Sequence, residues 1–493
     1  MSLAVIVAAS LGTAFLATYL DEKTWPFGIL MVIPTMLCGT KLVSLIYEGH
    51  FKPITLISLA TIFWYFAPLV VLTLGIPGFT ISANASVLSK ASSNLVAGLI
   101  IASPLVLLEA RHGLSFFKPL LDLSKNPPYI LLFAFTMIQL FLIAGGIWTY
   151  GSVLMASTRP DAGGVVALLR AVDLCATAAM PMTAFFLGIK LASRGRLTSG
   201  AVLLCGFALL IGLIWHFISG RRYLTVEIVL CAVLYLAARY RLQGKKLKVT
   251  GVGRIAILVA GVIVVAWPVY FAVRVASYTS KNSGEMPGIV DLVTSATEVK
   301  SQDLEAGYNQ KVIDRSAIIL SYSAVQSTLR SFAIGQGLLV SVAMASPPFI
   351  VDKSKLPGSP EKIWASLGVP EDDYSNTLAL DSYVDFGYIG YAVYLLIAVL
   401  PIYFIVLLFR FRKLPSSVVQ ISSIFLFLNT ETSVTGYLVF ARNVSILAII
   451  LFAIGSLGRR RRGSGSQRPG IIVDSVTPRQ EIGTQNYGRQ GSD

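Results

Sequence analysis

The run Tyr374-Ser-Asn-Thr-Leu-Ala-Leu-Asp-Ser-Tyr-Val-Asp-Phe-Gly-Tyr-Ile-Gly390 ends a long polar stretch and leads into the apolar run Gly387–Phe409. A helix needs about 17–25 apolar residues to cross the hydrocarbon core of a membrane, so this run is long enough to do so. Similar runs recur along the chain, which is 55% hydrophobic and 13% charged, whereas soluble domains are about 25% charged. The sequence therefore predicts an all-α, polytopic membrane protein.

The apolar runs predict about twelve transmembrane helices. We place them at Leu3–Leu20, Phe27–Tyr47, Ile54–Gly75, Leu95–Ala110, Tyr129–Tyr150, Val166–Ile189, Ala201–Ile218, Leu224–Ala238, Ile255–Val273, Gly387–Phe409, Val418–Leu428 and Val444–Leu457. The first run lacks the basic segment and the cleavage site of a signal peptide, so we expect it to be retained. Residues 1–457 should form one transmembrane domain, and residues 458–493 a disordered cytoplasmic tail.

The charges are distributed unevenly along the chain. The stretch Arg274–Asp385, between the ninth and tenth spans, holds 9 Lys and Arg against 13 Asp and Glu, whereas the rest holds 31 against 12. The basic excess thus lies in short loops, which is typical of cytosolic loops and does not indicate a nucleic-acid partner. The basic clusters are Lys190–Arg196, Arg239–Arg254, Arg410–Lys413 and Arg459–Arg462. They predict cytoplasmic termini and one large extracytoplasmic loop, residues 274–385.

Apolar residues recur at helical spacing within this loop, at Ile318, Tyr322, Val325, Leu329 and Phe332. This spacing predicts an amphipathic helix that either lies on the membrane surface or caps the helix bundle. The segment Phe332–Ile350 is apolar enough to form a thirteenth span or a re-entrant hairpin. The segment Pro347–Asp373 is rich in Pro, Gly, Lys and Asp, which predicts irregular loop.

Arginine residues on the extracytoplasmic side are candidates for binding phosphate. They are Arg221 and Arg222 between the seventh and eighth spans, Arg274 at the end of the ninth, Arg330 on the loop helix, and Arg442 between the last two spans. Guanidinium groups bind phosphate oxygens bidentately. Several together could stabilise a pyrophosphate leaving group without a metal ion. The alternative roles are snorkelling to lipid headgroups and pairing with acidic neighbours.

Two carboxylates and one histidine are candidates for catalysis. Asp381 and Asp385 are four residues apart, so they would share one face of a helix, and a carboxylate can deprotonate an acceptor hydroxyl. Asp385 could instead cap the N-terminus of the tenth span. His216 is expected near the outer face, where it could act in catalysis or serve a structural role. His50 and His112 are expected on the cytosolic side.

Patterns for metals and cofactors are missing from the sequence. The four cysteines, Cys38, Cys175, Cys205 and Cys231, all fall in apolar runs and show neither a disulfide framework nor zinc-ligand spacing. No Walker A loop or dinucleotide-binding glycine pattern occurs. We therefore expect no cofactor and no metal.

These features together resemble the bacterial O-antigen polymerase (Wzy-type), or oligosaccharide repeat-unit polymerase, family. The resemblance lies in about twelve spans with one long outer loop late in the chain, and in outward arginines after closely spaced spans. It also lies in the polar and aromatic run from Asn376 to Gly390, which leads into Asp-Phe-Gly-x-x-Gly. It implies an enzyme of the bacterial inner membrane that transfers a growing glycan from undecaprenyl pyrophosphate to the nonreducing end of a new lipid-linked repeat unit, at the periplasmic face.

The resemblance also implies roles for individual residues. Pyrophosphate would be bound by Arg221, Arg222 and Arg274, and the acceptor side would be lined by Asn376, Asp381 and Asp385. Tyr374, at the start of the same run, is a further candidate for binding substrate. The related O-antigen ligases use a histidine in the long outer loop, and this loop has none, which favours a polymerase. A ligase or another lipid-linked glycosyltransferase, and a polysaccharide transporter or flippase, are the alternative functions. The expected partners are the carrier-linked glycan, the lipid bilayer and a chain-length regulator protein.

Overall fold

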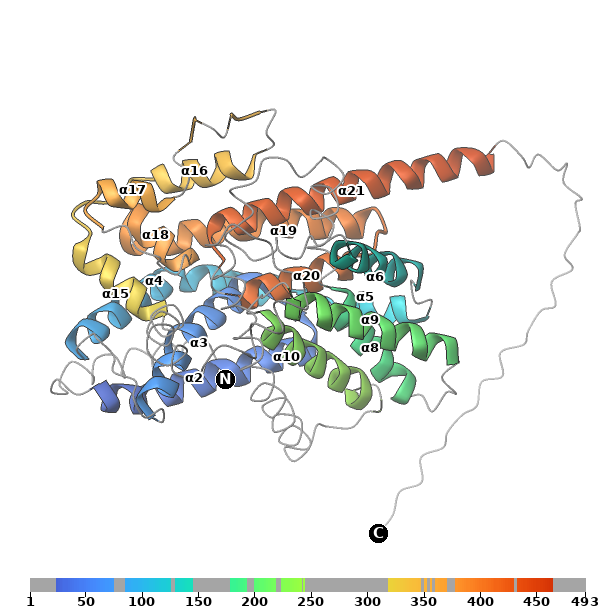
Figure 1. Ribbon diagram of the computed structural model, residues 1–493, viewed down its shortest axis with the longest axis horizontal. Helices are drawn as coiled ribbons and strands as arrows, with labels where there is room; N and C mark the ends of the chain where they lie inside the picture. The colour runs from blue at the N-terminus through green and yellow to red at the C-terminus, as the bar shows by residue number, and fades with distance from the viewer. Residues whose placement is uncertain are drawn as a thin grey trace, which may run out of the picture. The chain divides into compact units, whose positions relative to one another are not determined.

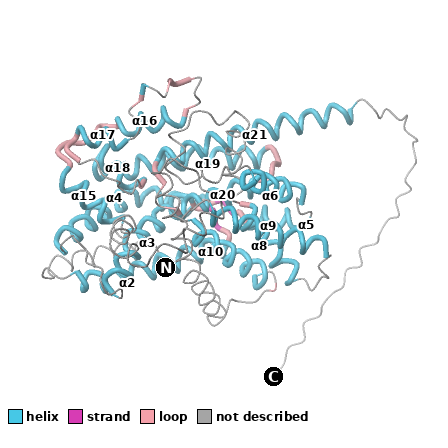
Figure 2. Tube along the Cα trace, viewed as in Figure 1, coloured by secondary structure: helices cyan, strands magenta, loops and turns pink. Residues whose placement is uncertain are grey.

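The computed structural model describes residues 24–74, 85–125, 129–144, 178–192, 199–218, 223–241, 243, 318–346, 350–352, 355–356, 360–369, 377–429 and 432–463. These residues are mostly α-helical, as predicted, and their strands form one short antiparallel pair (Figure 2). The predicted spans Leu3–Leu20 and Ile255–Val273 lie outside the described residues, as does the predicted tail beyond residue 463. The chain divides into two units, Met1–Leu447 and Ala448–Asp493.

The helices of the N-terminal half are α2 (Thr24–Glu48), α3 (Pro53–Leu74), α4 (Ala85–His112), α5 (Phe117–Lys125), α6 (Tyr129–Ala144), α8 (Ala179–Ala192), α9 (Ser199–Ile218), α10 (Tyr223–Leu236) and the π-helical turn η2 (Ala237–Arg241). The C-terminal half contains α15 (Ile318–Thr328), α16 (Gln336–Ala345), α17 (Pro360–Ser366), α18 (Leu378–Phe386), the 3-10 turn η5 (Gly387–Ile389), α19 (Gly390–Phe411), α20 (Ser416–Leu428) and α21 (Val434–Gly463). Strand β1 (His50–Phe51) pairs with β2 (Leu114–Ser115).

Three helical stretches among the described residues are long and apolar enough to cross a membrane, namely Met31–Glu48, Leu88–His112 and Leu378–Phe411. The last of these joins α18, η5 and α19. The apolar stretches described in the other helices are shorter, at 10–17 residues. Each predicted span, as far as it is described, overlaps a helix, while the total of twelve spans stays a prediction.

Among the described helices of the first unit, one group packs around α3, α4 and α19, and another packs around α8, which contacts α6, α9 and α10. Helix α2 lies along α3, and α19 contacts α3, α4 and α20 (Figure 1). Their apolar side chains face one another, so residues such as Leu56, Leu59 and Leu395 are fully buried. Helices that are apolar on all sides need such neighbours or lipid around them.

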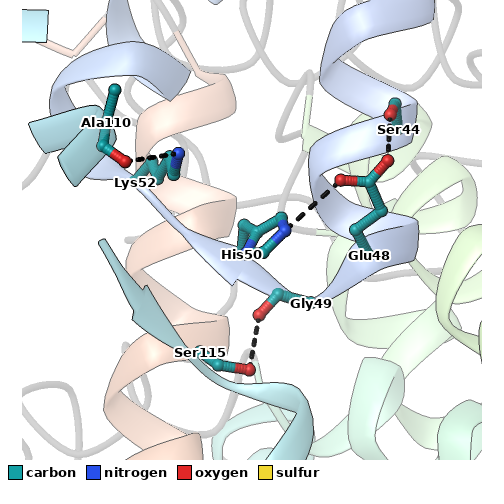
Figure 3. A network of polar contacts seen from close by, with 7 residues as sticks. All are labelled: Ser44, Glu48, Gly49, His50, Lys52, Ala110 and Ser115. Carbon is teal, nitrogen blue, oxygen red and sulfur yellow. Dashed lines mark hydrogen bonds and ion pairs between the residues drawn. The ribbon is translucent and has the colours of Figure 1, made fainter. Parts of the chain in front are cut away.

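One end of this bundle, which we call the β-pair end, is defined by β1 and β2. The contacts there are polar (Figure 3). Glu48 accepts a hydrogen bond from Ser44 (2.8 Å) and pairs with His50 (3.3 Å), and Lys52 Nζ donates to the carbonyl of Ala110 (3.4 Å). The strands thus bring the end of α2 and the start of α3 against the end of α4.

The same end contains a buried helix cap. The carboxylate of Glu109 on α4 accepts hydrogen bonds from the backbone N–H groups of Ile54 (2.9 Å) and Thr55 (2.8 Å), in the first turn of α3. These groups have no partner within the helix, and an anion there is also favoured by the helix dipole. Arg410, at the end of α19, donates to the carbonyl of Ser115 on β2. The C-terminal ends of α2, α4 and α19 and the N-terminal end of α3 therefore meet at the β-pair end.

The opposite end, which we call the α18 end, is defined by Thr377–Gly390. Helix α3 runs toward it, since the Tyr65 hydroxyl lies 2.8 Å from Thr377 Oγ1. Helix α19 begins there at Gly390 and ends, about 33 Å away by its helical rise, at the β-pair end. These relative directions agree with those expected from the basic clusters, whereas the compartment that each end faces stays a prediction.

Three sequence expectations about the long polar stretch require correction. The segment Pro347–Asp373 is not irregular throughout, because Pro360–Ser366 forms α17. The predicted amphipathic helix ends at Thr328, before Phe332. Among the described residues of Phe332–Ile350, the helical ones are Gln336–Ala345, and this ten-residue helix is about 15 Å long, half of what a span needs.

Candidate functional site

The described part of the polar run, Thr377–Gly390, forms helix α18 and the turn after it. Thr377 caps the N-terminus of α18, since its side chain accepts a hydrogen bond from the N–H of Leu380 (3.1 Å). The Tyr65 hydroxyl holds the same Thr377 side chain from α3. This double contact fixes the start of α18 against the helix bundle.

Asp381 and Asp385 lie one turn apart on α18, as their spacing predicted. Both side chains are buried, with relative exposures of 5% and 1%. Asp381 lies in the first turn, where the helix dipole favours a negative charge.

Asp385 acts as a helix cap, but for a helix other than the predicted one. Its carboxylate accepts hydrogen bonds from the N–H groups of Gly337 (3.1 Å) and Leu338 (2.8 Å), in the first turn of α16, and from the Tyr394 hydroxyl. The backbone carbonyl of Asp385 also accepts from Ile334 (3.0 Å). Asp385 therefore holds α16 against α18. The alternative that it caps the start of the tenth span is not observed, because α18 already continues into that span.

The glycines of the Asp-Phe-Gly-x-x-Gly pattern allow close packing at this junction. A Cβ on Gly390 would lie 1.9 Å from the carbonyl oxygen of Ser382. Gly387 has a positive φ of 61°, and a Cβ there would lie 3.0 Å from the Phe332 ring. A side chain at either position would push apart the chain segments that form the turn.

Arg442 holds the other end of α16. The sequence placed it between two spans, but it lies within α21, which begins ten residues earlier than the predicted twelfth span. Its guanidinium group donates to the carbonyl of Ala345 (2.9 Å) and to the side-chain oxygen of Asn443 (3.0 and 3.1 Å). An acidic group thus holds the N-terminus of α16 and a basic group its C-terminus, in accord with the helix dipole.

A hollow lined by tyrosines opens beside α18. It measures about 200 Å³, counting space that opens to solvent. Its walls come from α4, α15, α18, η5 and the start of α19, and its lining residues are Asn94, Leu95, Gly98, Tyr322, Ala379, Ser382, Tyr383, Gly387, Tyr388 and Tyr391. Across its mouth the half-exposed Tyr388 donates a hydrogen bond to the side-chain oxygen of Asn94 (2.9 Å).

Helix α15 covers this hollow by packing on protein. Its Tyr322 ring lies 5.9 Å from Tyr65 on α3 and 5.2 Å from Tyr383 on α18. Burial, and then the neighbouring phenols, raise the pKa of Tyr322 well above its ordinary value, so the group stays a neutral donor. The sequence left open whether this helix lies on the membrane surface or caps the helix bundle. In the structure it packs on the bundle.

Arg330 lies at the junction between α15 and α17. Its backbone N–H donates to the carbonyl of Leu367 (3.0 Å), and its stem lies against Gly368, where a Cβ would approach to 2.9 Å. Its side chain is exposed. The structure thus places Asp385 and Arg442 at opposite ends of α16. Arg330 lies at the junction of α15 and α17, and Asp381 lies one turn before Asp385 on α18.

Several predicted site residues lie outside the described residues, namely Arg221, Arg222, Arg274, Tyr374 and Asn376. His216 lies in α9, and its side chain is likewise outside the description. Within the described part of the chain, no group of three or more His, Cys, Asp or Glu residues could hold a metal ion.

Sequence reasoning missed the tyrosines of the hollow as a group. Tyr383 and Tyr388 lie within the quoted run, but Tyr322 was read only as part of an apolar stripe. For Asn94 the sequence offers one indication of a role in the site, which is its polar amide side chain directly before the fourth predicted span. No protein-family model, curated protein or solved structure matches this chain.

Proposed function

We propose that this protein polymerises carrier-linked oligosaccharide repeat units at the α18 end of its helix bundle. We place that end at the periplasmic face of the bacterial inner membrane. In each cycle the growing glycan leaves undecaprenyl pyrophosphate and joins the nonreducing end of the next carrier-linked unit.

The reaction exchanges one bond to the sugar for another. The bond between the reducing-end sugar of the growing glycan and its pyrophosphate breaks, and the electron pair leaves with the pyrophosphate. The acceptor hydroxyl forms the new glycosidic bond and gives up its proton to a base. We assign the base to Asp381, and we assign binding of the pyrophosphate to Arg221, Arg222 and Arg274.

The observation that carries this proposal is the position of α18. Asp381 is buried in its first turn, at the end of the apolar stretch Leu378–Phe411, with α15 and α16 packed nearby. A substrate anchored in lipid presents its pyrophosphate at headgroup level, where a membrane-crossing helix ends. The covering helices would keep water from the reacting groups.

Asp385 and Arg442 receive a different assignment from Asp381. Both were candidates for contact with substrate, but each is bonded to an end of α16. We assign them to positioning this helix beside the site. Arg330, with its exposed side chain, remains available to bind phosphate at the edge of the site.

The proposal can be tested by measuring the length of carrier-linked glycans in cells that lack their own copy of the gene. Wild-type protein should restore a ladder of long products. Asp381→Asn should lower the rate by about 10²–10⁴-fold, the usual contribution of a general base, and leave mainly single repeat units. Asp122→Asn, an exposed carboxylate on α5, is the matched control and should leave the ladder unchanged.

The outcomes separate the proposal from its alternatives. A normal ladder from Asp381→Asn, at equal protein level in the membrane, would exclude Asp381 as the base. Normal ladders from Arg221→Ala and Arg274→Ala as well would count against polymerisation by this site. A ligase would join finished glycan to another acceptor without building a ladder, and a transporter would form no glycosidic bond.

A further inference from the structure

Helix α16 turns its bulky apolar side chains away from the protein. Three small residues at intervals of four form its buried face, namely Gly337, Ser341 and Ala345. Leu339 and Val342 are exposed, as is Ile334 just before the helix, with an exposed fraction of 81%. A surface helix in water buries its large apolar side chains, whereas helices in membranes often pack on protein through small residues. The arrangement of α16 is therefore that of a helix in lipid.

The segment that contains α16 carries no charge. From Ser331 to Val351 the sequence has no Asp, Glu, Lys or Arg, and the charged residues on either side are Arg330 and Asp352. A charged side chain within the hydrocarbon core is costly. This segment lacks the residue types that would exclude it from the core.

The polar groups at the start of α16 have partners within the protein. The N–H of Gln336 donates to the carbonyl of Ala333 (3.1 Å), and those of Gly337 and Leu338 donate to the carboxylate of Asp385. The first N–H groups of a helix lack partners inside it, and at a surface in water they are free to bond to solvent. In hydrocarbon they must be satisfied by the protein itself.

The carbonyl groups at the other end are satisfied in the same way. Those of Val342 and Ala343 accept from the N–H of Ser346 (3.0 and 3.2 Å), and that of Ala345 accepts from the Arg442 guanidinium group. Charged side chains within membranes commonly pair with backbone carbonyls in this manner. Both ends of α16 are thus bonded as they need to be in the absence of water.

Helix α16 runs from the α18 end toward the middle of the bundle. Its first turn is bonded to Asp385 on α18 and its last carbonyl to Arg442 on α21. Helix α21 begins at the α18 end, because it follows α20, whose last carbonyl, that of Leu428, accepts from Trp64 (2.8 Å), next to Tyr65 on α3. Arg442 lies eight residues, about 12 Å of helical rise, beyond that start. The C-terminus of α16 therefore lies deeper along the bundle than its N-terminus.

The exposed apolar surface near α16 continues onto the membrane-crossing stretch Leu378–Phe411. The half-exposed ring of Phe332 packs edge-on against Tyr383 on α18 (6.0 Å between centroids). Ile389, in the turn after α18, and Phe404, within α19, are exposed as well. A long helix that exposes large apolar side chains in this way needs lipid around it. The outer face of α16 borders the same surface.

We propose that α16 is a re-entrant half-helix whose outer face lies against the acyl chains of the bilayer. Its N-terminus lies near the headgroups and its C-terminus deeper in the same leaflet. Its length of about 15 Å matches one leaflet, which is half of a hydrocarbon core about 30 Å thick. The occupant of the exposed face is lipid, and this placement does not depend on the reaction proposed above.

The test measures which solvent surrounds the outer face of α16. Single cysteines replace Ile334, Leu339 or Val342 in the full-length chain whose natural cysteines are serine, and each carries a nitroxide spin label in lipid nanodiscs. Power-saturation EPR compares collisions with oxygen, which concentrates in hydrocarbon, and with a neutral nickel chelate, which stays in water. The ratio of oxygen to nickel collisions should rise from Ile334→Cys through Leu339→Cys to Val342→Cys.

Two exposed positions provide the controls. Phe404→Cys, within α19, should give the high ratio of a lipid-facing label, and Lys355→Cys, in the polar segment after α16, the low ratio of a label in water. Ratios at Leu339→Cys and Val342→Cys as low as at Lys355→Cys would place α16 in water. Low collision rates with both reagents would show a protein partner or a second copy on this face, and equal ratios along the helix would show that it lies flat. Each of these three results overturns the proposal.

A second measurement uses the natural chain, so it does not depend on how a variant folds. Phospholipids with a photoreactive diazirine on the acyl chain are cross-linked to the protein in nanodiscs, and the adducts are mapped by mass spectrometry. Adducts should form on Leu339 or Val342 as well as on α19, and not on Lys355. Adducts on α19 without any on α16 overturn the proposal.

Discussion

Gly390 shows how much one methyl group could change at this site. A Cβ there would lie 1.9 Å from the Ser382 carbonyl oxygen, so the start of α19 would have to move away from α18. We expect Gly390→Ala to cost at least about 1–3 kcal/mol of stability, the usual cost of overpacking. The measurement is the midpoint of thermal unfolding of the purified protein in detergent.

Gly206→Ala provides the matched control for this substitution. Gly206 lies in helix α9, and nothing is within 4 Å of the position that its Cβ would take. Alanine in an open helix position is favoured by about 0.5–1 kcal/mol over glycine. An equal unfolding midpoint for Gly390→Ala and Gly206→Ala would contradict the close packing described for the turn.

At the scale of the residue, sequence reasoning succeeded where the relevant neighbours are close in the chain. The spacing of Asp381 and Asp385 correctly predicted that they share a helix face, because that depends on five consecutive residues. The bond from Asp385 to α16 joins residues 47 and 48 positions apart. A pattern of neighbouring residues cannot reveal such a contact. For this reason the sequence offered a cap on the tenth span as one alternative and gave no sign of the cap on α16.

At the scale of the element, α16 depends on a residue at each end. Asp385→Asn should weaken its N-terminal cap, at a cost typically of about 1 kcal/mol, and Arg442→Met should release the carbonyl of Ala345 at its C-terminus. Hydrogen exchange should then become faster at the first turn of α16 in the former variant and at its last turn in the latter. Arg412→Met, at the β-pair end, is the control.

This prediction also tests the assignment of Asp385 to positioning. If hydrogen exchange in α16 is unchanged in Asp385→Asn while glycan polymerisation is lost, Asp385 would act on the substrate itself.

The elements of the polar stretch were the hardest to predict, because α17 and α18 contain Pro, Ser and Asp and lack a long apolar run. The apolar segments that the structure describes were predicted as helices because their composition alone marks them, whereas their number as membrane spans stays a prediction.

At the scale of the whole molecule, the two ends of the bundle should lie on opposite sides of the membrane. Single cysteines at the exposed positions Ser327 on α15 and Lys118 on α5 report one end each, in a chain whose natural cysteines are replaced by serine. An impermeant maleimide added to intact cells should label Ser327→Cys and not Lys118→Cys, while permeabilised cells should show both labelled. The reverse pattern in intact cells would place α18 in the cytosol and exclude a periplasmic reaction.

The arrangement of the whole molecule was only partly predictable. Basic clusters indicated the relative direction of the helices, because they depend on local composition. The tyrosine hollow was not foreseen, since its residues come from helices separated by more than 200 positions in the chain. Packing between distant segments depends on how their side chains fit together, and this fit cannot be predicted from any one segment of the sequence.

The most direct test of the account uses purified protein in lipid vesicles with one defined undecaprenyl-pyrophosphate-linked repeat unit and no nucleotide sugar. The account predicts a ladder of carrier-linked products that differ by one repeat unit, with release of undecaprenyl pyrophosphate, and predicts its loss in Asp381→Asn. Recovery of the repeat unit unchanged from vesicles of well-folded wild-type protein would contradict it.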